Sequence, residues 1–178
     1  MDACLQHHER IDGIGFSNGF GQEEIGQIGR MAAICHTFDY MLTKTASTKA
    51  LDPAAAIQKL LEMNGAFDAD ILQFFIESVG LYPVGSFVRL RSDKLALVID
   101  EDPKHRNKPV VQAFYSFASE ERIIPRGIEL ARDQIKDEII GIADLYGLGL
   151  PEDGQLRELI FLSAHKLSDS SHAASTTC

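Results

Sequence analysis

The hydrophobic pattern of the chain changes at Val84-Gly85-Ser86-Phe87-Val88-Arg89-Leu90-Arg91, where apolar and polar side chains alternate. A compact apolar run, Leu95-Ala96-Leu97-Val98-Ile99, follows after Ser92-Asp93, a pair typical of turns. Alternation with a period of two is typical of a half-buried strand, so the two runs predict a β-hairpin. Residues 110–115 predict a third strand of the same small sheet, and residues 123–125 a short fourth one.

Before residue 84 the apolar residues recur at intervals of three and four, which predicts helices. The first helix covers about residues 23–44 and starts with two acids, which suit the positive end of a helix. Asp52-Pro53 is typical of a capped helix start, and this second helix ends near Asn64-Gly65. A third helix is expected from Asp68 to Gly80.

After the sheet, residues 129–144 and 152–167 again show helical spacing. The last eleven residues, 168–178, are small and polar, as expected of a frayed terminus. We therefore expect a mainly α fold in three parts: a helical domain at 1–80, a small antiparallel β extension at 81–118, and a helical tail at 119–178.

Composition excludes several classes of protein. The 178 residues are 45% hydrophobic and 24% charged, which is typical of a globular domain and excludes a disordered tail. Seventeen Lys and Arg stand against 26 Asp and Glu, and the net charge of -9 argues against nucleic acid or an anionic membrane as a general partner. Three cysteines without metal-finger spacing, no apolar run long enough to cross a bilayer, and no signal-like N-terminus predict a cytoplasmic protein with free thiols.

The densest polar stretch is His7-His8-Glu9-Arg10-Ile11-Asp12, which runs into a loop with four glycines in nine residues. Neutral imidazole binds Zn, Fe and Mn ions. Neighbouring residues of a helix point about 100° apart, so an adjacent pair on a straight helix suits two ions, or one ion and a substrate oxygen, better than one shared ion. The same pattern also fits two surface histidines near a chain terminus.

Residues 7–17 resemble the HHExxDGxGYP signature of the HD-GYP family, a bacterial branch of the HD-domain metal-dependent phosphohydrolases that hydrolyses cyclic di-GMP. Residues 30–40 are similar to the family's next helix, residues 49–53 to the segment that opens the helix after it, and residues 82–86 to the start of a β extension. The resemblance covers residue 4 to about residue 100. It implies an HD-domain-type helical bundle and a hydrolase of bacterial signalling.

The resemblance also implies roles for individual residues. His7 and His8 match metal ligands of the family, and Glu9 and Asp12 belong to its catalytic segment, as groups that orient the ligands or fix the loop. His36 stands where the family has a later aspartate. It is either a third ligand, which offers a neutral nitrogen in place of an anionic oxygen, or a packed or half-exposed helix residue.

Cofactor and substrate follow from the same resemblance: a divalent metal, Fe or Mn, in a two-metal site, and cyclic di-GMP. Lys44 and Lys49 are the cations nearest the position of the family's basic phosphate-binding stretch. The HD pair and the other upstream ligands of the family have no counterpart before His7. We therefore expect a truncated domain, its C-terminal half only, with an incomplete metal site and no activity as an isolated chain.

Gly13, Gly15 and Phe16 lie in the loop that, in the family, is associated with contacts to diguanylate cyclase (GGDEF) domains. Phe16 and Phe20 either form such a contact or cover the core beneath the loop. The alternative function is therefore a non-catalytic interaction module that binds a GGDEF-type or other bacterial signalling partner. Helices that lack packing partners would also expose apolar faces, which favours a homo-oligomer.

Overall fold

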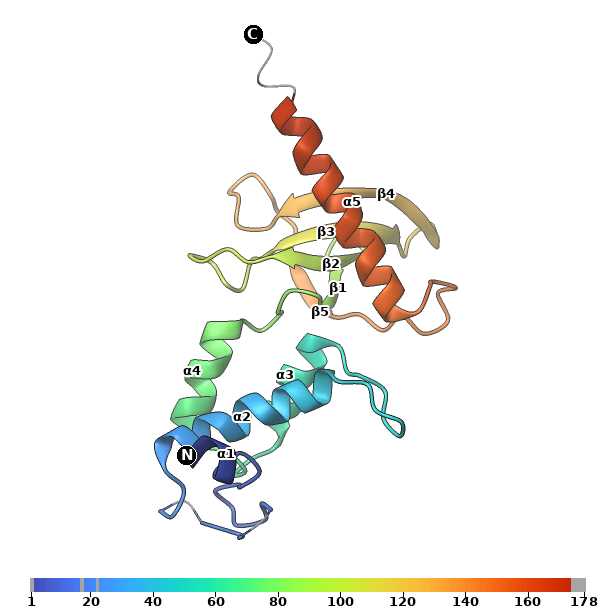
Figure 1. Ribbon diagram of the computed structural model, residues 1–178. Helices are drawn as coiled ribbons and strands as arrows, with labels where there is room; N and C mark the ends of the chain where they lie inside the picture. The colour runs from blue at the N-terminus through green and yellow to red at the C-terminus, as the bar shows by residue number, and fades with distance from the viewer. Residues whose placement is uncertain (1, 17, 22, 174–178) are drawn as a thin grey trace. The chain divides into compact units, whose positions relative to one another are not determined.

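The computed structural model describes residues 2–16, 18–21 and 23–173 (Figure 1). The chain divides into two compact units, residues 1–81 and residues 82–178. Helices account for only about a third of the residues, and among the described residues five antiparallel strands form one sheet. The prediction of a mainly α fold is therefore wrong. None of the helices in the described ranges is long and apolar enough to cross a membrane.

The described residues of the first unit form four helices; local capping sets the starts of two of them, whereas α2 (Gln27–Leu42) begins after the two acids of the predicted start and has no side-chain cap. The Asp52 side chain accepts a hydrogen bond from the Ala54 N–H at 2.9 Å, with Pro53 at the first helical position. Asp68 accepts from the Ile71 N–H at 3.2 Å in the same way. Both predicted helix starts are confirmed. The four helices are α1 (Asp2–Gln6), α2 (Gln27–Leu42), α3 (Pro53–Glu62) and α4 (Ala69–Val79).

The core of this unit lies where α2 and α3 meet the segment that leads into α4. Ile34 and Leu60 are fully buried there, and the rings of Phe38 and Phe75 meet edge to face with centroids 5.4 Å apart. An ion pair of 2.9 Å joins Arg30 of α2 to the cap residue of α4. Apolar packing and this ion pair thus hold α2 and α4 together.

The second unit is a five-stranded sheet with a long helix. Its strand order is β4-β3-β2-β1-β5, and all neighbouring strands are antiparallel. The predicted hairpin and third strand are present. The elements are β1 (Phe87–Leu90), β2 (Lys94–Asp100), β3 (Val110–Ser116), β4 (Glu121–Glu129), β5 (Ile139–Ile142) and α5 (Asp153–Ala173).

Both faces of this sheet are covered, which explains the long apolar runs of its central strands. On one face, Phe87 and Leu97 pack with Leu156 and Ile160 of α5. On the other face, a second cluster of buried valines, leucines and alanines is closed by Leu130 and by half-buried neighbours such as Tyr82, Ile128 and Ile139.

The predicted helix at 129–144 is wrong, because this segment is held by hydrogen bonds to residues far away in the sequence. The segment makes tight turns after β4 and then forms β5, which pairs with β1. The Arg91 N–H donates to the Glu138 carbonyl at 2.9 Å, and the Ser92 N–H donates to the Asp137 carboxylate at 3.0 Å. The run Ile139-Ile140-Gly141-Ile142 is rich in β-branched residues, a signal for a strand that its helical spacing obscured.

Strand β4 is longer than the predicted 123–125, and it lies at the edge of the sheet. Pro125 has no N–H to donate, and an edge strand tolerates that loss. At the other end of the unit, α5 extends to Ala173, beyond the predicted residue 167. Residues 174–178, with the end of the predicted frayed tail and Cys178, lie outside the described residues.

Candidate metal centre

Three histidine rings meet where α1 ends and α2 passes. The ring centroids of His7 and His8 are 4.0 Å apart, and the His36 ring stands edge-on to both, at 4.8 and 4.5 Å. One ring nitrogen from each residue lies within 4.8 Å of the others. The two neighbours converge because they follow α1 in a turn, so the divergence expected on a straight helix does not apply.

A glycine on α2 allows this close approach. A Cβ atom at Gly29 would lie 2.5 Å from the Gln6 Oε1 atom and 2.9 Å from the Gln6 Cβ atom, so only glycine fits against the end of α1. His36 is two helical turns further along and therefore projects from the same face of α2. The tight contact at Gly29 brings the residues after Gln6 to the His36 ring.

A backbone contact fixes the tautomer of His7. Its Nδ1 atom lies 3.0 Å from the Cys4 carbonyl oxygen, which can only accept a hydrogen bond. Nδ1 therefore carries the proton, and Nε2 presents the lone pair that a metal needs. Metal-binding histidines are commonly oriented by such a bond on the other ring nitrogen.

The surroundings of the His36 ring disfavour its protonated form. Partial burial lowers the pKa of His36, and the neighbouring His8 and His7 lower it further, while Asp39 acts in the opposite direction. A neutral imidazole is the form that binds a metal ion. The surroundings of His36 thus favour the neutral imidazole, which can bind a metal ion.

The donor set fits one divalent transition metal. Such ions bind imidazole at about 2.0–2.1 Å, which sets the ligand nitrogens of a tetrahedral site roughly 3.4 Å apart. The three rings would therefore turn inward around an ion. Among the described residues, these three histidines are the cluster that could hold a metal, and the cluster contains no carboxylate. Three neutral donors suit a single ion better than a pair of ions.

Glu9 links the histidine pair to the glycine-rich loop. Its side chain is buried, and its carboxylate accepts hydrogen bonds from the Asn18 N–H at 2.7 Å and the Phe20 N–H at 3.2 Å. The Phe16 N–H donates to the His8 carbonyl at 3.0 Å. The loop therefore folds back onto the segment that carries the histidines.

The sequence of the loop suits this fold. A Cβ atom at Gly15 would lie 2.4 Å from the Arg10 nitrogen, so the backbone there leaves no room for a side chain. Gly13 has φ of 74°, a conformation that favours glycine. Asp12 is exposed, forms an ion pair with Arg10, and accepts from the Ile14 N–H at 3.0 Å. These contacts shape the turn at the start of the loop.

The comparison with known families gives a match in the same part of the chain as the histidine cluster. Residues 1–71 match the family model of the HD domain. This part of the chain belongs to the HD domain family. The three histidines lie inside the matched range, and the predicted membership of an HD-domain phosphohydrolase family is confirmed.

Two curated relatives of the chain are named as cyclic di-GMP phosphodiesterases. One, from Pseudomonas aeruginosa, is 38% identical over 141 residues, which cover 79% of this chain and 34% of the relative. The other, from Borreliella burgdorferi, is 24% identical over 108 residues, or 60% of this chain and 28% of the relative. The chain thus spans 34% of the length of the first relative and 28% of the length of the second. The longer match exceeds the first unit, so it includes part of the sheet unit as well.

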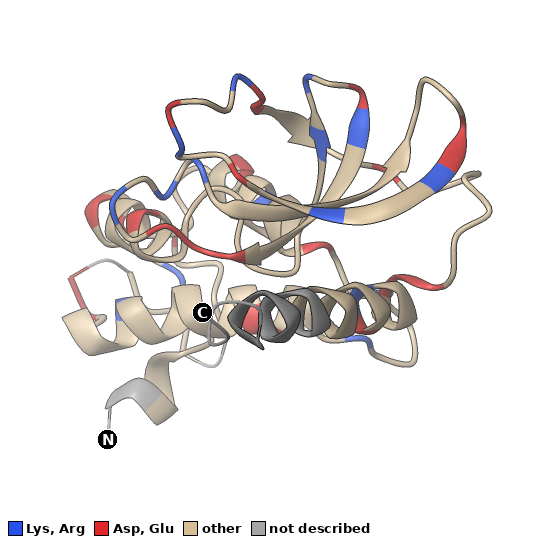
Figure 2. Cartoon of the chain, turned by 90° about the horizontal axis from the view of Figure 1, so that it is seen from above, with Lys and Arg blue, Asp and Glu red and all other residues tan. Residues whose placement is uncertain are grey.

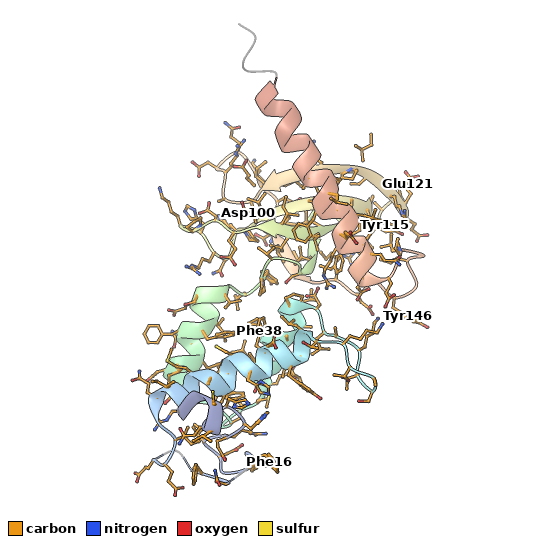
Figure 3. All side chains as sticks on the ribbon, in the orientation of Figure 1. Phe16, Phe38, Asp100, Tyr115, Glu121 and Tyr146 are labelled. Atoms are coloured by element: carbon orange, nitrogen blue, oxygen red, sulfur yellow. The ribbon has the colours of Figure 1, made fainter. Side chains whose placement is uncertain are left out.

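Other predicted site residues of the HD domain lie at its surface. Phe16 is 77% exposed, so its ring does not cover the core, and its neighbour Ile14, which was not among the predicted residues, is 75% exposed; Figure 3 shows the Phe16 side chain on the loop. Phe20 is half-buried, and Ser17 lies outside the described residues. Lys44 and Lys49 are exposed in the segment between α2 and α3.

Sequence reasoning missed two features that shape this site. The first is Gly29, whose role appears only when α1 lies against α2. The second is the Cys4 carbonyl, a backbone group that no residue pattern identifies as a partner of His7. The position of Gly29, two turns before His36, was the one signal available in the sequence.

Proposed function

We propose that this chain is part of a metal-dependent phosphohydrolase of HD-GYP type that acts on cyclic di-GMP. The observation that carries the proposal is the cluster of three imidazole nitrogens within 4.8 Å, inside the range that matches the HD domain. The names of both relatives indicate the substrate. The histidine-rich signature, with its downstream residues in the family's order, supports assignment to the HD-GYP branch.

In this proposal His7, His8 and His36 hold one divalent ion, Fe or Mn. Bound there, the metal supplies a Lewis acid for phosphodiester hydrolysis. Two-metal phosphoesterase sites keep their ions about 3.5–4 Å apart, which requires more ligands than three neutral nitrogens. We therefore propose that the chain binds one ion and is inactive in isolation.

The remaining predicted residues take supporting roles in the proposal. Glu9 fixes the loop through two backbone amides and positions His8, while Asp12 shapes the adjoining turn. Lys44 and Lys49 attract the substrate phosphates, but as flexible point charges they lack the bidentate geometry of arginine. The affinity for the dinucleotide should accordingly be low.

A second candidate function is a non-catalytic signalling module, which the exposed loop favours. Ile14 and Phe16 present two large apolar side chains at the tip of a loop whose base is fixed by Glu9. Exposed apolar groups on a positioned loop are typical of a contact with another protein. A GGDEF-type domain is the partner that the resemblance implies, and a second copy of the chain is the alternative.

Metal titration tests the first candidate. We expect isothermal titration of the full chain with Mn²⁺ under anaerobic conditions to give one ion per chain, and we expect His7→Ala and His36→Ala each to weaken binding about tenfold or more. His105→Ala is the control, because His105 is an exposed loop residue beside Asp102. Equal loss in all three variants, or no binding at all, contradicts the proposal.

Hydrolysis is measured separately. The chain is incubated with cyclic di-GMP and Mn²⁺ or Fe²⁺, and the linear dinucleotide is sought by chromatography. We expect no turnover. Turnover that disappears in His7→Ala would contradict the inactivity of the isolated chain but support the proposed class of enzyme.

The charge of the third ligand gives a finer prediction. His36→Asp replaces a neutral nitrogen with an anionic oxygen, which hard divalent cations prefer. We expect this variant to bind Mn²⁺ more tightly than the parent chain does. An affinity equal to that of the parent chain would show that residue 36 is a helix residue and not a ligand.

A further inference from the structure

The sheet unit contains an open pocket of about 370 Å³, far from the histidines in sequence. It lies between strand β4, the start of β2 and the segment that follows β4. Ile128 and Ile135 give it an apolar surface, and Lys94, Arg126 and Lys136 bring positive charge. Its volume lies within the range of small-molecule sites.

Hydrogen bonds fix one wall of this pocket. The Arg132 guanidinium binds both carboxylate oxygens of Glu129 at 2.6 Å. The Asp137 carboxylate accepts from the Ser92 N–H at 3.0 Å and from its hydroxyl. Both acids of the pocket are therefore occupied by donors that hold the segment in place.

The three other cations are not neutralised in this way. Within the described ranges, no ion pair involves Lys94, Arg126 or Lys136. With Arg132 included, four cations and two acids line the pocket, which gives it a charge of +2 in a chain whose net charge is -9. Figure 2 shows basic positions on the strands of the sheet. A locally positive pocket in an acidic protein is a feature that attracts anions.

We propose that this pocket binds the phosphate group of a small phosphate ester. Arg126 can hold two phosphate oxygens with its planar guanidinium, and Lys94 and Lys136 add positive charge at the rim. The apolar body of the ligand lies against Ile128 and Ile135. A single phosphate matches the excess charge of the pocket, and the volume accommodates a compound about as large as a mononucleotide.

Titration of the ¹⁵N-labelled full chain, followed by heteronuclear NMR, tests this site. The probes are 5′-GMP, glucose 6-phosphate and inorganic phosphate. We expect saturable shifts of the Gly127, Ile128 and Lys136 amides. GMP alone indicates a nucleotide site, both esters indicate a general phosphate-ester site, and both results support the proposal. Inorganic phosphate as the tightest of the three would overturn the role of the apolar surface.

Matched variants separate the pocket from general charge attraction. Arg126→Ala should weaken ester binding about tenfold or more, as expected for loss of a charge-assisted bidentate contact. Arg122→Ala is the control, because Arg122 is an exposed arginine of the same strand that does not line the pocket. Equal weakening in both variants, or no saturable shift with any probe, would overturn the proposal.

Discussion

The two units of this chain bury their apolar residues to very different degrees. In the sheet unit, β2 has four consecutive buried residues and β3 has five. In the helical unit, no residue of α4, which is described throughout, is fully buried, and Phe74 is 69% exposed. On α2, Ile28 and Met31 are 62% and 50% exposed. The sheet completes its core within its own unit, whereas the helices leave apolar surface in contact with solvent.

The largest expected difference in unfolding free energy is between two phenylalanine substitutions, one in each unit. Phe87 is 1% exposed and packs edge to face against Phe114, so Phe87→Ala should cost about 3–5 kcal/mol of unfolding free energy. Phe74→Ala should change it by less than about 0.5 kcal/mol. Urea unfolding followed by circular dichroism measures both. A similar loss in the two variants would show that Phe74 is covered, for example by a second copy of the chain.

Hydrogen exchange compares the units without any substitution. We expect the amides of residues 85–115 to exchange at least 100-fold more slowly than those of residues 1–45, because the strands are buried on both faces. Exchange read by mass spectrometry decides this. Slow exchange over residues 1–45 with fast exchange over the strands would reverse the comparison and mean that the helical unit is stabilised by another partner.

A smaller effect is expected at the buried acid of the helical unit. Glu9→Ala leaves the Asn18 and Phe20 amides without their acceptor, which should cost about 1–3 kcal/mol and open the loop to proteolysis. Glu23→Ala is the matched control, because Glu23 is exposed. Unfolding curves and limited digestion measure the two changes. If the variants behave alike, the Glu9 carboxylate does not fix the loop.

The smallest effect concerns pH. The Arg30 side chain and the Ile71 amide lower the pKa of Asp68 below its ordinary value of 3.8. The native state therefore binds this proton more weakly than the unfolded state does. The stabilisation is full above the unfolded pKa and is lost as the pH falls through the lower folded pKa.

For Asp68 we expect a contribution of about 1 kcal/mol at neutral pH. Asp68→Asn keeps an oxygen at the helix start but removes the charge. Its stability should be lower than that of the parent chain at pH 6, and the difference should shrink as the pH falls below 3.8. A difference that does not change with pH would show that the ion pair with Arg30 contributes nothing.

The parts of the fold that sequence could predict are those decided locally. Asp52-Pro53 and Asp68 mark their helix starts because the capping bonds lie within three residues. Strand β5 could not be recognised in this way, because its structure depends on pairing with β1, about fifty residues earlier. The predicted helix at 129–144 followed a spacing that the pairing overrides.

The same distinction between local and long-range contacts applies to the candidate site. The signature predicted His7 and His8 as ligands, and His36 was left as either a ligand or a helix residue; the structure groups the three side chains. How two adjacent histidines face one point depended on the end of α1 and on the contact at Gly29, neither of which follows from residue types alone. The pocket in the sheet unit was hidden by the error at 129–144, since a helix would have placed its wall elsewhere.

The close contact at Gly15 limits how this loop can change by mutation. Its backbone touches the Glu9–Arg10 peptide so tightly that even a methyl group would displace the turn. Ile14 and Phe16 on either side are exposed and can be replaced at little cost in folding. The loop therefore combines one invariable position with two variable ones. Mutation can alter the surface that it presents while the histidines behind it keep their places.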